Sequence, residues 1–263
     1  MISTSVAAQP TTSGVNASAD VKIASGLADT TAEETVIVRL SERPENTIRT
    51  TAESNQISSM QTHAAATQSP FNRFADGNPH VEIKDEFWIT NALVVTVDRS
   101  QIPLRRLGTV ENVERIHENF EVEVTSTAAA ETATRAASVS ASSTDSYTWG
   151  LNTTNVPQTW ATYGARGQGV KVAVLDTGVD PDHPDIDIQT DHWKDFGPDN
   201  SLTPKDYGSH GTHVSGTIVG GNASGTHIGV APDAELWHGA VLTNCDSNGC
   251  TGTFAQIISG TEW

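Results

Sequence analysis

The chain has 263 residues, enough for one large domain or two ordinary ones, and 36% of them are hydrophobic. Its formal net charge of −17 argues against nucleic acids and anionic membranes as partners, because both repel an acidic surface. The longest useful apolar run, residues 92–97, is far too short to span a bilayer, so no membrane segment is expected.

Acidic residues far outnumber basic ones in the second half of the chain. From Ser146 onward there are 13 acidic residues against four basic ones. Such a surface is typical of halophilic proteins, and an ordinary acidic surface explains the charge equally well.

The start of the chain, MISTSVAAQPTTSG, has neither the basic region nor the apolar region of a secretory signal. A cytoplasmic location, an incomplete start and an export route without a visible signal all stay open. Residues 1–33 are rich in small and polar types and are expected to be disordered.

Residues 34–124 predict a small α+β domain. The pattern follows the order β-α-β-(β)-α-β, which is typical of a ferredoxin-like sandwich. The expected elements are strands at residues 35–40, 87–97 and 111–124, a helix within residues 46–76, and a short helix from Pro103 to Gly108. On the long helix, the expected inward positions are Ile48, Ala52, Ile57, Met60 and Ala64.

A low-complexity tract of Ala, Ser and Thr separates this domain from the rest. Residues 125–146 therefore predict a flexible linker that proteases can cut, followed by a second domain at residues 147–263. Within that domain, VKVAVLD is a short unbroken apolar run that ends at Asp176. Such a run is typical of a parallel strand buried on both faces.

Asp176 follows the predicted strand directly. In open α/β sheets, ligands and catalytic groups gather at the carboxyl ends of the strands, so Asp176 is a candidate site residue. An aspartate that merely caps the next turn is the simpler alternative for this residue taken alone.

The stretch GSHGTHVSGT carries His210 and His213, three residues apart on a predicted, tightly packed helix. Two such histidines can share a metal ion, but a metalloprotease helix of the form H-E-x-x-H also carries a glutamate as base. Here Gly211 and Thr212 stand between them. The alternative is one exposed histidine at the helix start that acts as a base, with the other in the core.

These motifs carry a family resemblance. VKVAVLDTGVDPDHPDI, SHGTHVSGTIVG, GVAPDAELWHGAVL and ISGTEW, in this order, resemble the subtilisin-like serine proteases, and the composition is similar to their haloarchaeal branch. The resemblance implies an α/β fold with a doubly wound parallel sheet, here incomplete. It implies Asp176 as the acid that orients His210, His210 as general base, and His213 as a structural position. It implies a peptide or protein substrate and no cofactor for catalysis.

The third member of the family's triad does not occur in these residues. The family's serine lies in a G-T-S-x-A motif, and none of Ser215, Ser224, Ser247 and Ser259 has that context. We therefore expect this chain to be truncated before its nucleophile, inactive alone, and aggregation-prone, since a doubly wound sheet needs helices on both faces.

The resemblance extends, more weakly, to residues 34–124. In the family, such a domain is an N-terminal propeptide that assists folding and inhibits the enzyme in cis until it is removed. Processing is expected between Thr125 and Tyr147. The resemblance also implies an extracellular enzyme and a structural calcium ion held by Asp185. A solvated acidic face around Asp180, Asp182, Asp187 and Asp191 is the alternative there.

Cys245 and Cys250 flank a polar turn and predict either a small disulfide loop or two free thiols. By resemblance this loop lies at the rim of the cleft.

Two other interpretations of the whole chain stay open. One is a catalytically dead remnant that inhibits or helps to fold a subtilase through residues 35–124. The other is a metal-binding module that uses His210 and His213.

Overall fold

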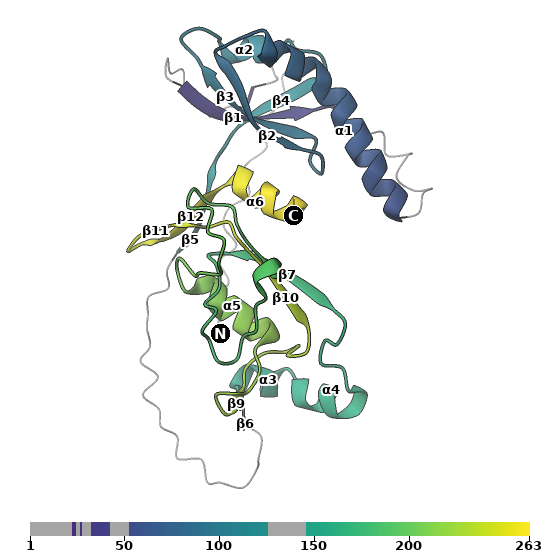
Figure 1. The fold of residues 1–263 in the computed structure, drawn as a ribbon, viewed down its shortest axis with the longest axis vertical. Coiled ribbons are helices and arrows are strands. Elements are labelled where there is room, and N and C mark those ends of the chain that lie inside the picture. Colours follow the sequence, from purple (N-terminus) through teal and green to yellow (C-terminus); the bar gives the residue numbers. More distant parts are fainter. Residues whose placement is uncertain (1–22, 25–26, 28–32, 43–52, 126–145) are drawn as a thin grey trace. The chain divides into compact units, whose positions relative to one another are not determined.

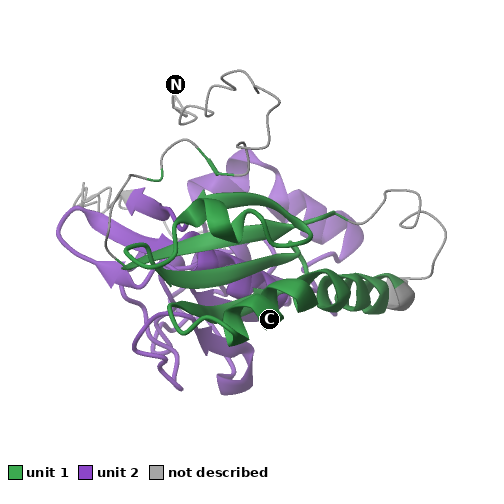
Figure 2. Cartoon of the chain, turned by 90° about the horizontal axis from the view of Figure 1, so that it is seen from above, with its two compact units in different colours: residues 1–118 green, residues 119–263 purple. Residues whose placement is uncertain are grey.

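The computed structural model describes residues 23–24, 27, 33–42, 53–125 and 146–263. The chain divides into two compact units, Met1–Glu118 and Asn119–Trp263, which Figure 2 shows in different colours.

The first unit is built on one antiparallel sheet. Its strands are β1 (Glu33–Leu40), β2 (Val81–Phe87), β3 (Ala92–Asp98) and β4 (Val113–Glu118), in the order β2-β3-β1-β4. Alternate residues of β1 and β3 face the core, among them Val36, Val38, Leu93 and Val95, all at or near zero exposure. The predicted element order is the observed one in this unit.

Two helices accompany this sheet (Figure 1): α1 (Glu53–Asp76) and α2 (Leu104–Leu107). α2 follows Pro103 and ends at Gly108, as predicted. The buried residues of α1 include Ala64, Gln68 and Phe71. The predicted inward position Ile57 is wrong, because its side chain is 46% exposed. The other two early positions, Ile48 and Ala52, lie outside the described residues.

Two predicted strands are each divided in the structure. Residues 88–91 form a turn with Asn91 at a positive φ of 46°, so the run from Phe87 to Val97 is the end of β2 and most of β3. The final predicted strand breaks at Asn119 and Phe120 into β4 and β5 (Glu121–Thr125). β4 pairs with β1, whereas β5 belongs to the second unit.

The second unit contains a parallel sheet of β7 (Lys171–Asp176), β10 (Glu235–Ala240) and β8 (Trp193–Asp195), in that order. β7 and β10 lie side by side in it (Figure 1). Val174 packs in one cluster with residues of α5 (His210–Val219). Leu175 lies on the other face, against Gly260 of α6 (Phe254–Glu262). Helices therefore contact both faces. Burial is incomplete, however: Lys171 and Ala173 are exposed, so the strand is not buried along its whole length as predicted.

Smaller elements complete the second unit. They are α3 (Trp149–Thr153), α4 (Val156–Tyr163), a 3-10 turn η2 (Thr190–His192), the parallel pair β6 (Ser146–Tyr147) and β9 (Thr226–His227), and the antiparallel sheet β11 (Asn244–Cys245), β12 (Gly249–Thr253) and β5. The order in this last sheet is β11-β12-β5, so β5 pairs only with β12.

Candidate active site

Asp176 is the last residue of β7 and lies at the carboxyl edge of the parallel sheet. It is 7% exposed and stands opposite Ala240, the last residue of β10. The backbone N–H of Thr177 donates a hydrogen bond of 2.7 Å to Asp176 Oδ1. The strand end and the turn after it thus hold a buried carboxylate where sequence reasoning expected a site.

His210 is the first residue of α5 and faces this carboxylate. Its Nδ1 lies 2.7 Å from Asp176 Oδ1 and 2.9 Å from Asp176 Oδ2, and its side chain is 43% exposed. A carboxylate can only accept, so the neutral ring donates from Nδ1 and keeps Nε2 as a basic acceptor. The structure therefore brings together the two residues that the sequence placed in the site, in a geometry suited to a general base.

Asp206, which sequence analysis missed, fixes the start of α5. Its carboxylate accepts hydrogen bonds from the Thr177 and Thr212 hydroxyls and from the N–H groups of Gly208 (3.0 Å), Ser209 (2.9 Å) and Thr212 (2.8 Å). The residue before the helix, Ser209, makes no side-chain cap. Asp206 thus satisfies donors that the helix itself leaves unpaired. An aspartate just before the predicted helix was the available signal.

The turn after Asp176 and the start of α5 contact each other through their main chains. A Cβ added to Gly211 would lie 2.0 Å from the carbonyl oxygen of Gly178, and Gly178 itself has a φ of +113°. The Gly211 N–H also donates to Thr177 Oγ1 at 2.8 Å. Only glycine fits at this crossing, which lets the helix start approach the strand end closely enough for the Asp176–His210 hydrogen bond.

His213 is exposed, so the expectation that the second histidine lies in the core is wrong. Nor does the geometry support a metal site on this helix. Within the described ranges, no group of three or more His, Cys, Asp and Glu side chains could hold a metal ion.

Asp185 is buried, but its surroundings do not fit a calcium ligand set. Its Oδ1 accepts the N–H of Ser224 at 3.1 Å. Burial by itself would raise the pKa of Asp185, but hydrogen bonds from Ser224 and Ala223 outweigh it and hold that pKa below the usual value. Calcium needs about six to eight oxygen ligands, and here N–H donors point at the one carboxylate. The four aspartates of the alternative acidic face are all exposed.

A buried histidine lies behind the site. His238 of β10 has no exposed surface, and its Nδ1 is 3.0 Å from the hydroxyl of Ser215 in α5. Its Nε2 has no hydrogen-bond partner among the described residues. Burial lowers the pKa of His238 to about 4, although the charges of Asp176 and Asp206 oppose the shift. Sequence analysis gave no signal for this residue.

Cys245 and Cys250 form a disulfide, so the alternative of two free thiols is wrong. The bridge joins β11 to β12. It belongs to an apolar cluster with Val241 and Leu242, and Val122 and Val124 of β5 pack against that cluster.

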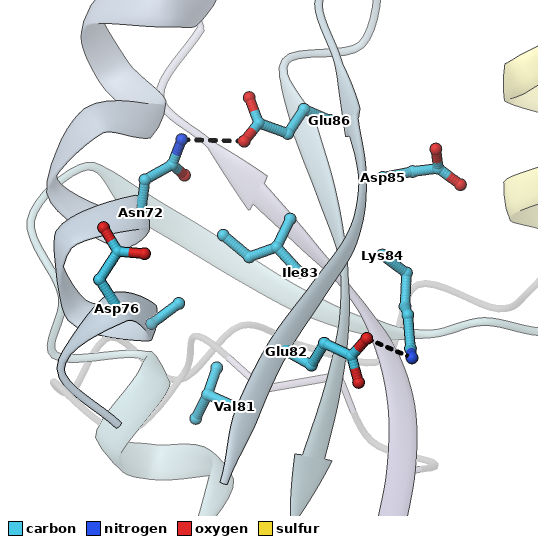
Figure 3. A pocket seen from close by; sticks show the side chains of 9 residues that line it. Asn72, Asp76, Val81, Glu82, Ile83, Lys84, Asp85 and Glu86 are labelled. Atoms are coloured by element: carbon cyan, nitrogen blue, oxygen red, sulfur yellow. Dashed lines mark hydrogen bonds and ion pairs between the residues drawn. The ribbon is translucent and has the colours of Figure 1, made fainter. Parts of the chain in front are cut away.

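A surface pocket in the first unit lies between α1 and β2 (Figure 3). Four of its nine lining residues are acidic. Two pairs of its polar side chains bond to one another: Asn72 with Glu86 at 2.9 Å, and Lys84 with Glu82 at 2.6 Å. No histidine, serine or cysteine lines it. None of the helices in the described part of the chain is long and apolar enough to cross a membrane.

Comparison with known proteins points to one family. Residues 167–263 match the model of the Subtilase family. The Major intracellular serine protease of Bacillus subtilis (strain 168) is 40% identical over 117 residues, which are 43% of this chain and 35% of that protein. For Subtilisin E of the same organism, identity is 44% over 100 residues, 38% of this chain and 25% of that protein. For the Alkaline protease of Alkalihalobacillus alcalophilus it is 42% over 115 residues, 44% of this chain and 28% of that protein. The chain thus spans between 25% and 35% of the length of these relatives.

Proposed function

We propose that this chain is the front part of the precursor of a subtilisin-like serine endopeptidase, with Asp176 and His210 as two members of an Asp/His/Ser triad. The observation that carries the proposal is the hydrogen bond of 2.7 Å between His210 Nδ1 and the buried Asp176 carboxylate. The match of residues 167–263 to the Subtilase family supports it.

In this mechanism, His210 Nε2 takes the proton of a serine hydroxyl as that oxygen attacks the substrate carbonyl. His210 then returns the proton to the leaving amine. Asp176 holds the ring in the tautomer with the proton on Nδ1 and stabilises the imidazolium that forms in between. No serine of these 263 residues has a G-T-S-x-A context, and the proposal places the nucleophile beyond Trp263.

We further propose that residues 34–124 act as a ferredoxin-like propeptide in cis, and that their end inhibits the enzyme. β5 pairs in antiparallel register with β12, from Glu121 opposite Thr253 to Thr125 opposite Gly249. An extended peptide added to a sheet edge is a common mode of peptide recognition. The pairing of β5 with the edge of β12 supports this proposal, because a peptide bound by this mode would pair in the same way. Processing is expected after this strand, between Thr125 and Tyr147.

The test starts from the coding DNA beyond the codon for Trp263, read in all three frames for G-T-S-x-A. The protein that includes this motif should hydrolyse a chromogenic peptide and react with a serine-directed fluorophosphonate probe. His210→Ala should abolish both activities, whereas His213→Ala, at an exposed position on the same helix, should retain them. Full activity of the His210→Ala variant would refute the assignment.

An inhibitor of a separate subtilase is the second candidate function. The pairing of β5 with β12 supports it, because β5 is an extended strand that can add to a sheet edge. The purified chain, titrated against a bacterial subtilisin, should then inhibit it with a measurable Ki, and a version with Val124→Asp should not. Absence of inhibition at high micromolar concentration would leave the protease precursor alone.

We propose secretion as the fate of the mature enzyme. The disulfide supports an oxidising compartment. A relative named as an intracellular protease shows that its family has both kinds of member. Fractionation of producing cells, followed by detection of residues 147–263 in the medium, decides between them.

A further inference from the structure

The disulfide stands directly opposite a side chain of the strand bound at the β12 edge. In the β5–β12 pair, Val124 is opposite Cys250 and Val122 is opposite Gly252. Directly opposite residues of an antiparallel pair project to the same face with their Cβ atoms about 4.5–5.5 Å apart. Both valines pack against the apolar cluster that contains Cys250, and Glu121 and Glu123 are exposed.

The disulfide cannot recede from the bound strand. A Cβ added to Gly208 would lie 2.2 Å from Cys250 Sγ and 3.3 Å from Cys245 Sγ. The sulfur atoms therefore rest on the main chain of Gly208, two residues before His210 and anchored by Asp206. Cys250 is only 6% exposed. A larger side chain opposite Cys250 thus meets a wall that is fixed from behind.

Opposite Val124, the cystine fills the space across the strand pair. Opposite Val122, the partner is Gly252, and a Cβ added there would lie 1.9 Å from the carbonyl oxygen of Val241. Main chain therefore fills the space beside Gly252, whereas the sulfur of a side chain fills it at Cys250.

We propose that the Cys245–Cys250 disulfide is a specificity-determining element of this edge. It restricts the strand position opposite Cys250 to small or β-branched side chains. Applied to substrates, this size restriction rests on the proposed function, and the substrate is then an extended peptide with a small or β-branched residue opposite Cys250. Applied to β5, the restriction concerns the chain itself and does not depend on that function.

The experiment measures hydrogen exchange of the full chain by mass spectrometry in peptides that cover residues 119–125 and 249–253. Val124→Phe should raise the exchange rates of both segments about tenfold or more, because overpacking against a fixed wall expels the strand. Glu123→Phe, at an exposed position of the same strand, is the matched control and should behave as the unsubstituted chain.

The role of the cystine itself is tested in a second background. With Cys245→Ala and Cys250→Ala together, Val124→Phe should lose most of its effect, because the wall is gone. The chain with both cysteines replaced by alanine could lose the β11–β12 hairpin. In that case the test is the comparison of Val124→Ala, Val124→Thr and Val124→Phe in the chain that keeps its disulfide. Exchange rates of Val124→Phe equal to those of the Glu123→Phe control, or an effect that persists without the disulfide, would overturn the proposal.

This readout does not depend on catalysis. Exchange rates that follow the predicted order, in a protein whose serine-containing form cleaves nothing, would refute the proposed protease and leave the size rule standing. Cleavage of peptides without any preference for side-chain size opposite Cys250 would refute the size rule and leave the proposed protease standing.

Discussion

Asp206 shows how a single side chain can hold two sequence motifs in register. Its carboxylate accepts from Thr177, next to the catalytic candidate Asp176, and from the N–H groups at the start of α5. Thr177 and α5 thereby share one acceptor. The distance from Asp176 to His210 is set by this contact and by the glycine crossing behind it.

Removal of this acceptor should destabilise the second unit. Asp206→Ala leaves several N–H and hydroxyl donors without a partner, and we expect the free energy of unfolding to fall by about 2 kcal/mol. Urea denaturation followed by tryptophan fluorescence measures it. The control Asp182→Ala, at an exposed aspartate, should change stability by less than about 0.5 kcal/mol. A loss equal to that of the control would show that water replaces Asp206 without cost.

His238 should make stability depend on pH. Burial lowers its pKa from 6.5 to about 4, so between these values the unfolded chain binds a proton that the folded chain does not. The free energy of unfolding therefore falls as pH drops from 6.5 and is lower by at most about 3 kcal/mol near pH 4. Above pH 6.5 the residue has no such effect.

The measurement compares the chain with His238→Gln, which cannot titrate but can bond to Ser215, at pH 7, 6, 5 and 4. Other acidic groups titrate in both proteins, so the difference between the two profiles isolates His238. The variant should lose stability less steeply between pH 6.5 and 4. Parallel profiles would mean that folding does not shift the pKa of His238, so that both states bind its proton equally.

At the scale of elements, sequence reasoning succeeded where a local signal and the tertiary structure agree. The helix that starts at His210 and the strand that ends at Asp176 were expected from sequence periodicity and motifs. Their contact followed from the family resemblance. α2 between Pro103 and Gly108 follows from local chemistry alone.

Tertiary structure decided the remaining elements. The alternating stretch from residue 111 to 124 has one uninterrupted β pattern, yet β4 and β5 join different sheets, because partners far along the chain compete for them. The turn at Asn91 likewise divides one continuous β pattern into the end of β2 and β3. His238 escaped detection because a core histidine has no sequence motif of its own, whereas the position of Asp206 just before the predicted helix was a signal that sequence analysis did not use.

The loop after α5 provides a test at this scale. It contains Ser224, whose N–H donates to the buried Asp185 carboxylate in place of a cation. We expect Asp185→Ala to lower the free energy of unfolding by about 2 kcal/mol, whether calcium or EDTA is present. Asp187→Ala, at an exposed neighbour, is the control. EDTA itself should leave the melting temperature of the unsubstituted chain unchanged, and a fall of several degrees would restore Asp185 as a calcium ligand.

At the scale of the whole molecule, the large negative net charge should affect stability. A net charge of −17 on 263 residues repels itself, and salt weakens this repulsion by shortening the Debye length from about 10 Å at 0.1 M to about 3 Å at 1 M. We therefore expect the melting temperature to rise by several degrees between 0.1 and 1 M KCl, in agreement with a halophilic origin. Sucrose at equal osmolality controls for excluded-volume effects. An unchanged melting temperature would favour an ordinary acidic surface.

Only Asn119 and Phe120 separate β4 from β5, although the two strands belong to different units. These two residues join β5 to the first unit, whereas its covalent connection to β12 runs through the residues that follow Thr125. Pairing of β5 at the β12 edge is therefore intramolecular, with an effective concentration of millimolar order. A free peptide with the same five residues must reach comparable concentrations to compete. One cut between Thr125 and Tyr147, where processing is expected, abolishes this advantage, so the attached strand becomes a ligand that dilution can remove.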